Sequence, residues 1–146
     1  MHAAQACNLS QLLRQTAALH PDRPGVIQGG RQWTWREIDR RVDAMAAALR
    51  ARGVGPGDRV LVLSRNTLPM FESGWVAFRL GAVWVPVNFR LTPPEVAQLA
   101  ASSGATAMLV DAGFEAHVDA VRAEAPAVGL VVAMAGGVPG REDWES

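Results

Sequence analysis

The residues that could carry chemistry in this chain include no lysine, because all 14 lysine-or-arginine positions are arginine. A lysine can hold phosphates in a glycine-rich loop, form a Schiff base, or stabilise the charge that develops in an adenylation transition state. The chain therefore supplies no residue for any of these lysine-dependent roles. The remaining candidates are glycine clusters, three histidines, one cysteine and a few acidic and hydroxyl side chains.

Two glycine clusters are candidates for phosphate binding. A dinucleotide-binding loop places G-x-G-x-x-G directly after a strand and at the start of a helix. Gly53, Gly55 and Gly57 instead follow a predicted helix and precede a predicted strand. The cluster at 136–140 follows an apolar run, but Pro139 interrupts it and no helical pattern comes next. We therefore expect both clusters to end helices and form surface turns.

The histidines and the cysteine lack partners for metal binding or nucleophilic catalysis. His2 lies at the terminus, His20 precedes a proline, and His117 falls in a predicted surface helix, so no two share the i, i+4 spacing of a helical metal site. Cys7 is the only cysteine and can form no internal disulfide. A thiol also needs a base beside it to act as a nucleophile. Solvated or capping roles are expected for the histidines.

Ser64, Asp111 and Glu115 are the last candidates. Asp111 and Glu115 are four residues apart, but an acid and base pair works across a cleft, and Asp111 is better placed to cap the helix that follows it. Ser64 ends a strand without the glycines of a nucleophile elbow, so helix entry through Ser64, Asn66 or Thr67 is the stronger interpretation. The sequence therefore predicts no catalytic, cofactor-binding or metal-ligating residue.

Length and composition exclude several classes of protein. A chain of 146 residues fits one domain. Its 14 basic and 14 acidic residues cancel, and no basic stripe is present to follow a phosphate backbone, so nucleic acid is not an expected partner. No apolar run approaches the roughly 18 to 20 residues of a transmembrane helix. The N-terminal residues lack the basic and apolar regions of a secretory signal, which predicts a cytoplasmic location.

Strands and helices alternate through most of the chain. Apolar residues stand at consecutive positions in four short runs, which is typical of parallel strands covered on both faces. The predicted strands are 60–63, 83–85, 107–110 and 130–133, and the predicted helices between them are 67–80, 93–103 and 113–124. This order predicts an α/β fold with a doubly wound, mainly parallel sheet and helices on both faces.

A helix and a short β-hairpin are predicted before the sheet. Asn8 can cap a helix that continues to about residue 19. Its leucines are expected on one side: Leu9, Leu12, Leu13 and Leu19. The segments 26–28 and 31–33 form a hairpin through the glycine pair between them.

A second helix follows the hairpin directly. Thr34 and Glu37 have the spacing of a capping box, in which each side chain satisfies a backbone group of the other residue. The predicted apolar stripe is Trp35, Ile38, Val42, Met45 and Leu49. This periodicity predicts a helix that ends at Gly53.

The helix at 67–80 is apolar around most of its circumference. Its apolar residues include Phe71, Trp75, Val76, Ala77, Phe78 and Leu80, and its charged residues are Glu72 and Arg79. A helix of this kind is usually buried on several sides, and 146 residues leave one face without cover. Soluble monomers rarely leave a large apolar patch bare. The sequence therefore predicts self-association through Phe71, Trp75 and Phe78.

Three stretches, read in order, carry a family resemblance. They are NLSQLLRQTAALHPDRPGVI, QWTWREIDRRVDAMAAALRARGVGPGDRVLVLSRN and ESGWVAFRLGAVWVPVNFRLTPPEVAQLAASSGATAMLV. The GVGPGDRV turn, the asparagine that opens the next helix, and GAVWVPVNFRL at a fixed distance are specific in combination. From about Leu9 to Val132, the chain closely resembles the N-terminal portion of the adenylate-forming (AMP-binding) superfamily. Its best match is to the acyl-CoA synthetases, the fatty-acid and aryl-acid CoA ligases.

The resemblance implies a parent enzyme that uses ATP, Mg and coenzyme A. Such an enzyme activates a carboxylic acid to an acyl-adenylate and then transfers the acyl group to the thiol of coenzyme A. The family's Ser/Thr/Gly-rich loop ending in Pro-Lys-Gly, its later adenylate motifs and its C-terminal lysine match no position here, so no functional residue can be carried over. The VPVNFRL variant favours ligases of fatty or cyclic acids over peptide-synthetase adenylation domains.

These observations predict that residues 1–146 are an N-terminal subdomain, a fragment of the ligase large domain, without the nucleotide-loop region and the C-terminal domain. This part is expected to be a scaffold that binds no cofactor and is inactive alone. The alternative is a stand-alone, non-catalytic binding or assembly module with the same fold. A reading frame that continues beyond Ser146 into a Pro-Lys-Gly loop would favour the ligase, and a natural stop codon would favour the module.

Overall fold

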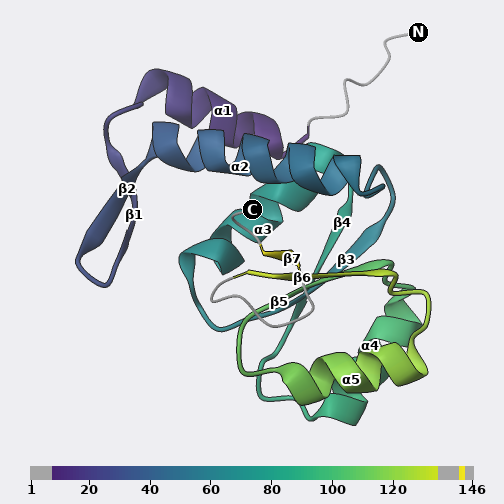
Figure 1. The fold of residues 1–146 in the computed structure, drawn as a ribbon. Coiled ribbons are helices and arrows are strands. Elements are labelled where there is room, and N and C mark those ends of the chain that lie inside the picture. Colours follow the sequence, from purple (N-terminus) through teal and green to yellow (C-terminus); the bar gives the residue numbers. More distant parts are fainter. Residues whose placement is uncertain (1–7, 135–141, 144–146) are drawn as a thin grey trace, which may run out of the picture.

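The computed structural model describes residues 8–134 and 142–143 (Figure 1). The first part contains α1 (Ser10–Leu19), the strands β1 (Pro24–Gln28) and β2 (Arg31–Thr34), and α2 (Trp35–Ala51). The alternating part contains β3 (Arg59–Leu63), α3 (Leu68–Leu80), β4 (Val83–Val87), α4 (Pro93–Ser103), β5 (Ala107–Val110), α5 (Glu115–Glu124), β6 (Leu130–Ala133) and β7 (Glu142–Asp143). No helix in these ranges is both long and apolar enough to cross a bilayer.

The main sheet has the strand order β4-β3-β5-β6-β7, and all of its neighbouring strands are parallel. The prediction of four parallel strands is therefore confirmed, with β3 between β4 and β5 as its unbroken apolar pattern indicated. The short β7 is an additional strand that the sequence pattern did not predict. β4 is an edge strand, and Val83 at its start is 49% exposed, so the expected cover on both faces is incomplete there.

Helices cover both faces of the sheet and form two cores (Figure 1). Val60 and Val62 of β3 pack in one core with the side chains of α1, α2 and α3. Leu61 and Leu63 point to the other side and pack with α4 and α5. Consecutive apolar residues on one strand thus serve opposite cores, which is the doubly wound α/β arrangement predicted from the sequence.

The predicted hairpin and capping box are confirmed. β1 and β2 pair antiparallel, and the glycine pair between them has positive φ at both positions, as a two-residue hairpin turn requires. At the start of α2, the Glu37 N–H donates to Thr34 Oγ1, and the Thr34 N–H donates to Glu37 Oε2 at 2.7 Å. The buried residues of α2 are Ile38, Val42, Met45, Ala46 and Leu49, close to the predicted stripe.

These capping contacts change the acidity of the carboxyl groups that form them. The hydrogen bond from the Thr34 backbone, and then that from its hydroxyl, lower the pKa of Glu37 below its ordinary value of 4.5. The Thr92 backbone and hydroxyl lower the pKa of Glu95 at the start of α4 in the same way. Since the folded-state pKa is lowered, the stabilisation is present above the unfolded-state pKa and is lost as the pH falls through the lowered value.

The prediction for the apolar side of α1 is correct for Leu13 and wrong for the other three leucines. Ser10, Leu13 and Ala17 are its buried residues, whereas Leu9, Leu12 and Leu19 are exposed. Ser10 and Ala17 are small, which lets the helix lie close to α2 and α3, and their spacing with Leu13 defines one helical face. Asn8 does accept a hydrogen bond from the Ser10 N–H, and its amide also donates to the Phe78 carbonyl of α3.

Candidate functional site

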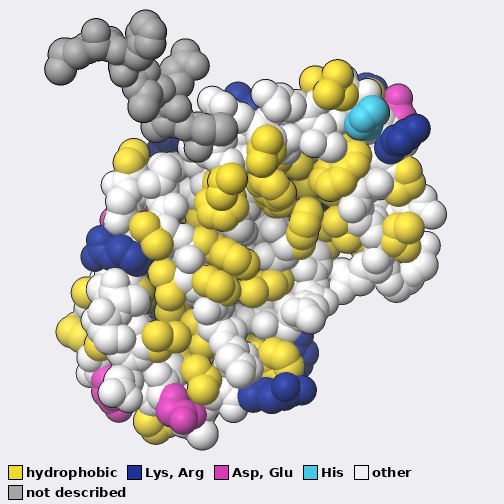
Figure 2. Space-filling model, turned by 180° about the vertical axis from the view of Figure 1, so that it is seen from behind, with side chains coloured by type: hydrophobic (Ala, Val, Ile, Leu, Met, Phe, Trp, Pro, Cys, Tyr) yellow, Lys and Arg dark blue, Asp and Glu magenta, His cyan; other side chains and the backbone are white. Residues whose placement is uncertain are grey.

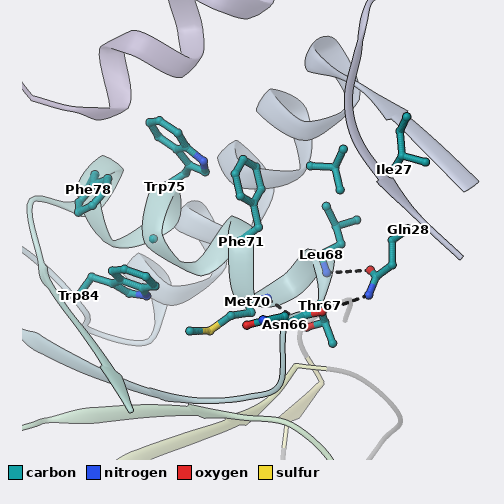
Figure 3. Close-up of a pocket in the computed structure, with 12 residues that line it drawn as sticks. Ile27, Gln28, Asn66, Thr67, Leu68, Met70, Phe71, Trp75, Phe78 and Trp84 are labelled. Carbon is teal, nitrogen blue, oxygen red and sulfur yellow. Dashed lines mark hydrogen bonds between the residues drawn. The ribbon is translucent and has the colours of Figure 1, made fainter. Parts of the chain in front are cut away.

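An apolar groove runs along α3 between β1 and β4, and we call it the aromatic groove (Figure 3). It encloses about 560 Å³. Its lining residues come from β1, the loop between β3 and α3, α3 itself and β4: Val26, Ile27, Gln28, Asn66, Thr67, Leu68, Met70, Phe71, Gly74, Trp75, Phe78 and Trp84. None of these residues is ionisable. Figure 2 shows a face of the molecule on which hydrophobic side chains gather while charged side chains lie towards its margins.

Four aromatic rings form a continuous row in the aromatic groove (Figure 3). Phe71 meets Trp75 and Trp75 meets Phe78, each edge to face with ring centroids 6.1 Å apart. Phe78 in turn meets Trp84 of β4 at 6.5 Å, and the Trp84 indole N–H donates to the Ser73 hydroxyl. Edge-to-face pairs each add about 0.5–1.5 kcal/mol beyond simple burial, so the row holds its own shape without a ligand.

Hydrogen bonds at the start of α3 hold the end of the aromatic groove that lies next to β1. Gln28 at the end of β1 accepts a bond from the Leu68 N–H at 2.9 Å, which ties the hairpin to the helix (Figure 3). The Thr67 hydroxyl accepts a bond from the Met70 N–H, so Thr67 is the N-cap of α3. Helix entry through this segment is thereby confirmed, with Thr67 as the capping residue.

The charged residues of α3 pair with α2 and do not line the aromatic groove. Glu72 is fully buried, and the Arg41 guanidinium of α2 contacts both of its carboxylate oxygens, at 2.6 and 3.1 Å. The Arg79 side chain is 5% exposed and forms ion pairs with Asp39 and Asp43 of α2, both at 2.7 Å. Both charged side chains of α3 are therefore paired with α2, and the α3 residues that line the aromatic groove are uncharged.

The sequence alone did not identify these α2 partners. The signal was present in the spacing, because Glu72 and Arg79 are seven residues apart and share one helical face. Asp39 and Asp43 are four residues apart on α2 and likewise share a face. Matching two such pairs would have predicted that the charged side of α3 faces α2.

The turn containing Gly53, Gly55 and Gly57 is not built for phosphate. The Gly55 N–H donates to the Asp58 carboxylate at 2.7 Å, and the Gly57 N–H donates to the Gly81 carbonyl. A phosphate-binding loop leaves its N–H groups free to point at the ligand, whereas these are used within the protein. The predicted structural role is confirmed for this cluster. The cluster at 136–140 lies outside the described residues.

Ser64 and Asp111 end neighbouring parallel strands and lie close together. The Ser64 hydroxyl is 2.8 Å from the Arg65 carbonyl and 3.2 Å from Asp111 Oδ2. The predicted capping role of Asp111 is wrong, since α5 begins at Glu115 and the carboxylate is instead engaged by Ser64 and the Ala112 N–H. Ser64 faces acceptor oxygens and no histidine in the described structure, so this pair orders the strand ends and does not activate a nucleophile.

The histidines of the described residues do not gather into a cluster of metal ligands. The ring nitrogen Nε2 of His117 is 2.9 Å from the Leu91 carbonyl, and His20 is exposed. His2 and Cys7 lie outside the described ranges. Within those ranges, no group of three or more His, Cys, Asp and Glu side chains is placed to hold a metal ion.

Comparison with known proteins places the chain in a family. The family model for AMP-binding enzymes matches residues 13–145. The chain is 35% identical over 120 residues to the fatty acid–[acyl-carrier-protein] ligase ScoC of Streptomyces coeruleorubidus, which covers 80% of the chain and 23% of that ligase. It is 42% identical over 93 residues to a feruloyl-CoA synthase of an Amycolatopsis species, covering 64% of the chain and 19% of the synthase.

The fold is also similar to that of solved structures. The inhibitor-bound N-terminal domain of FACL13 from Mycobacterium tuberculosis matches with a TM-score of 0.81 and 30% identity, over 87% of the chain and 33% of that domain. The chain spans only 18–25% of the length of the curated relatives it matches. Since the family model matches nearly the whole sequence, the chain belongs to the AMP-binding enzyme family.

Proposed function

We propose that this chain is the N-terminal scaffold part of the large domain of an ATP-dependent acid–CoA ligase and is inactive by itself. The observation that carries the proposal is the match to the AMP-binding family over residues 13–145 by a chain that spans about a fifth of a ligase. The sheet and its two helical layers would support nucleotide and acyl sites built from other parts of the enzyme. A cytoplasmic location is part of this proposal.

The parent enzyme is proposed to bind ATP, Mg and coenzyme A. The acid carboxylate attacks the α-phosphorus of ATP, the bond to pyrophosphate breaks, and an acyl-adenylate forms. The thiol of coenzyme A then replaces AMP to give a thioester. In that enzyme, the described residues of this chain would support the fold. The polar groups of this chain near the strand ends form hydrogen bonds with other residues of the chain.

The proposed substrate of the parent is a fatty acid or an aryl or cyclic acid. The two relatives above support this range, since one is named for fatty acids and the other for ferulate. Their names also include both a carrier protein and coenzyme A as acceptors. The selecting residues are not identified in this chain.

Purified residues 1–146 are expected to catalyse no acid-dependent exchange of radiolabelled pyrophosphate into ATP. The chain has no lysine to stabilise the adenylation transition state, and a single missing charge-stabilising group typically costs about 10²–10³ in rate. The assay would include Mg-ATP with a fatty acid or ferulate, and ScoC with a fatty acid as positive control. Exchange above background that depends on the acid would contradict the scaffold proposal.

A second candidate function is a non-catalytic assembly module, and the exposed aromatic groove is the observation that favours it. Either candidate predicts that the isolated chain self-associates through Phe71, Trp75 and Phe78, because the groove has no cover within the described structure. Size-exclusion chromatography with light scattering at micromolar concentration should give a mass above 15.6 kDa. A stable monomer at this concentration would count against the uncovered groove as an association surface.

A further inference from the structure

We propose that the aromatic groove is the surface on which the remaining part of the ligase N-terminal domain docks, with an apolar, uncharged segment packed against Phe71, Trp75 and Phe78. The inference rests on the proposed function, since it takes the chain to be one part of a larger ligase domain. It adds to that function the residues that join the two parts and the chemistry of the segment that covers them.

The charge distribution on α3 determines what can occupy the aromatic groove. Glu72 and Arg79 form ion pairs with α2, and no lining residue is ionisable. A charged partner side chain would be desolvated there without a counter-charge, which is costly. An apolar segment instead gains by burying Phe71, which is 39% exposed. The occupant is therefore expected to be apolar where it meets the row of rings.

The aromatic groove is already shaped before anything binds. The aromatic row and the bond between Gln28 and the start of α3 hold its two sides in place. Exposed apolar residues also lie on the neighbouring elements, at Leu12 of α1 and Ile27 of β1. Such a preorganised surface loses little conformational entropy on docking, as is usual for an internal interface of one domain.

The size of the relatives identifies the occupant. The chain covers 33% of the FACL13 N-terminal domain, so about two thirds of a domain of that kind lies outside the match. That larger part must share a core with this one for the domain to be compact. A second copy related by a two-fold axis would present the same concave surface, so the two grooves would meet without filling each other. Association of the isolated chain then follows from the missing cover.

The test compares Phe71→Arg in two settings, the isolated chain and a chimeric ScoC in which residues 8–134 of this chain replace the matched region. In the isolated chain, Phe71→Arg should raise the monomer fraction and lower the urea midpoint only modestly, because it removes one ring contact, with Trp75, from a side chain that is 39% exposed. In the chimera it should lower the yield of soluble, folded protein by roughly tenfold or more, because a charge is forced into an apolar contact.

Ala123→Arg is the matched control, since Ala123 is exposed on α5, in the opposite helical layer. It should leave both proteins unchanged. Equal yields of the Phe71→Arg and unsubstituted chimeras would overturn the inference. Equal destabilisation of the isolated chain and the chimera by Phe71→Arg would also overturn it, because Phe71 would then act within this chain. A dimeric chimera dissociated by Phe71→Arg would assign the groove to a second copy instead.

The same chimera separates the docking inference from the proposed function. An unsubstituted chimera that does not fold counts against docking, because the ScoC remainder then fails to accept this surface. A folded chimera that gives no fatty-acid-dependent pyrophosphate exchange contradicts the proposed function, while its response to Phe71→Arg still decides the docking surface.

Discussion

Arg41→Met is expected to lower the free energy of unfolding by about 3–5 kcal/mol, the usual cost of removing one partner of a buried ion pair. Glu72 is fully buried in α3, and the Arg41 guanidinium contacts both of its carboxylate oxygens from α2. Methionine fills a similar volume but leaves the carboxylate buried without a counter-charge. The loss would therefore come from the uncompensated charge rather than from a cavity.

Urea denaturation of the chain measures this effect. Arg40→Met is the matched control, because Arg40 is the neighbouring residue on α2 and is exposed, and a change there should stay within about 0.5 kcal/mol. The double variant Arg41→Met with Glu72→Met should recover much of the loss, since two apolar side chains can replace a buried pair at little net cost. If Arg41→Met and Arg40→Met had the same small effect, the buried pair would not support the packing of α2 on α3.

Much of the fold could be predicted because local signals agreed with the tertiary arrangement. Consecutive apolar residues in β3, β5 and β6 predicted two-sided burial, and the structure has helices on both faces there. The Thr34 and Glu37 pattern predicted the start of α2 because a capping box depends on residues only three apart. Signals of this kind are complete within a few residues of sequence, so they can be read without knowing the fold.

The orientation of helices was harder to predict because it depends on partners that are distant in sequence. The leucines of α1 suggested an apolar side, but the small residues Ser10 and Ala17 face the core and let α1 approach its neighbours. In the same way, the apolar circumference of α3 did not reveal which side was covered. That was decided by the charged face of α2, about 30 to 40 residues earlier in the chain.

Some residues of the candidate site could be predicted from local spacing, and others depend on partners distant in sequence. Phe71, Trp75 and Phe78 could be grouped from the sequence because residues three or four apart on one helix are neighbours. Gln28 and Trp84 could not, since the bond from Leu68 to Gln28 spans 40 residues and Trp84 reaches the row from the next strand. The lack of a lysine needed no structure, because composition alone removes that chemistry.

Leu61→Ala is expected to lower the free energy of unfolding by about 2–5 kcal/mol, the range for deleting a fully buried leucine side chain. Leu61 is fully buried in the core beneath α4 and α5, while the adjacent Val62 is fully buried in the core beneath α2 and α3. Val62→Ala should therefore also destabilise, by more than about 1 kcal/mol.

Val83→Ala on the edge strand β4 is the matched valine control and should change stability by less than about 0.5 kcal/mol, because Val83 is 49% exposed. Urea unfolding of the three variants separates the two faces of the sheet. A loss at only one of Leu61 and Val62 would mean that one helical layer does not pack on the sheet in solution, and the uncovered surface would then extend beyond the aromatic groove to a whole face of β3.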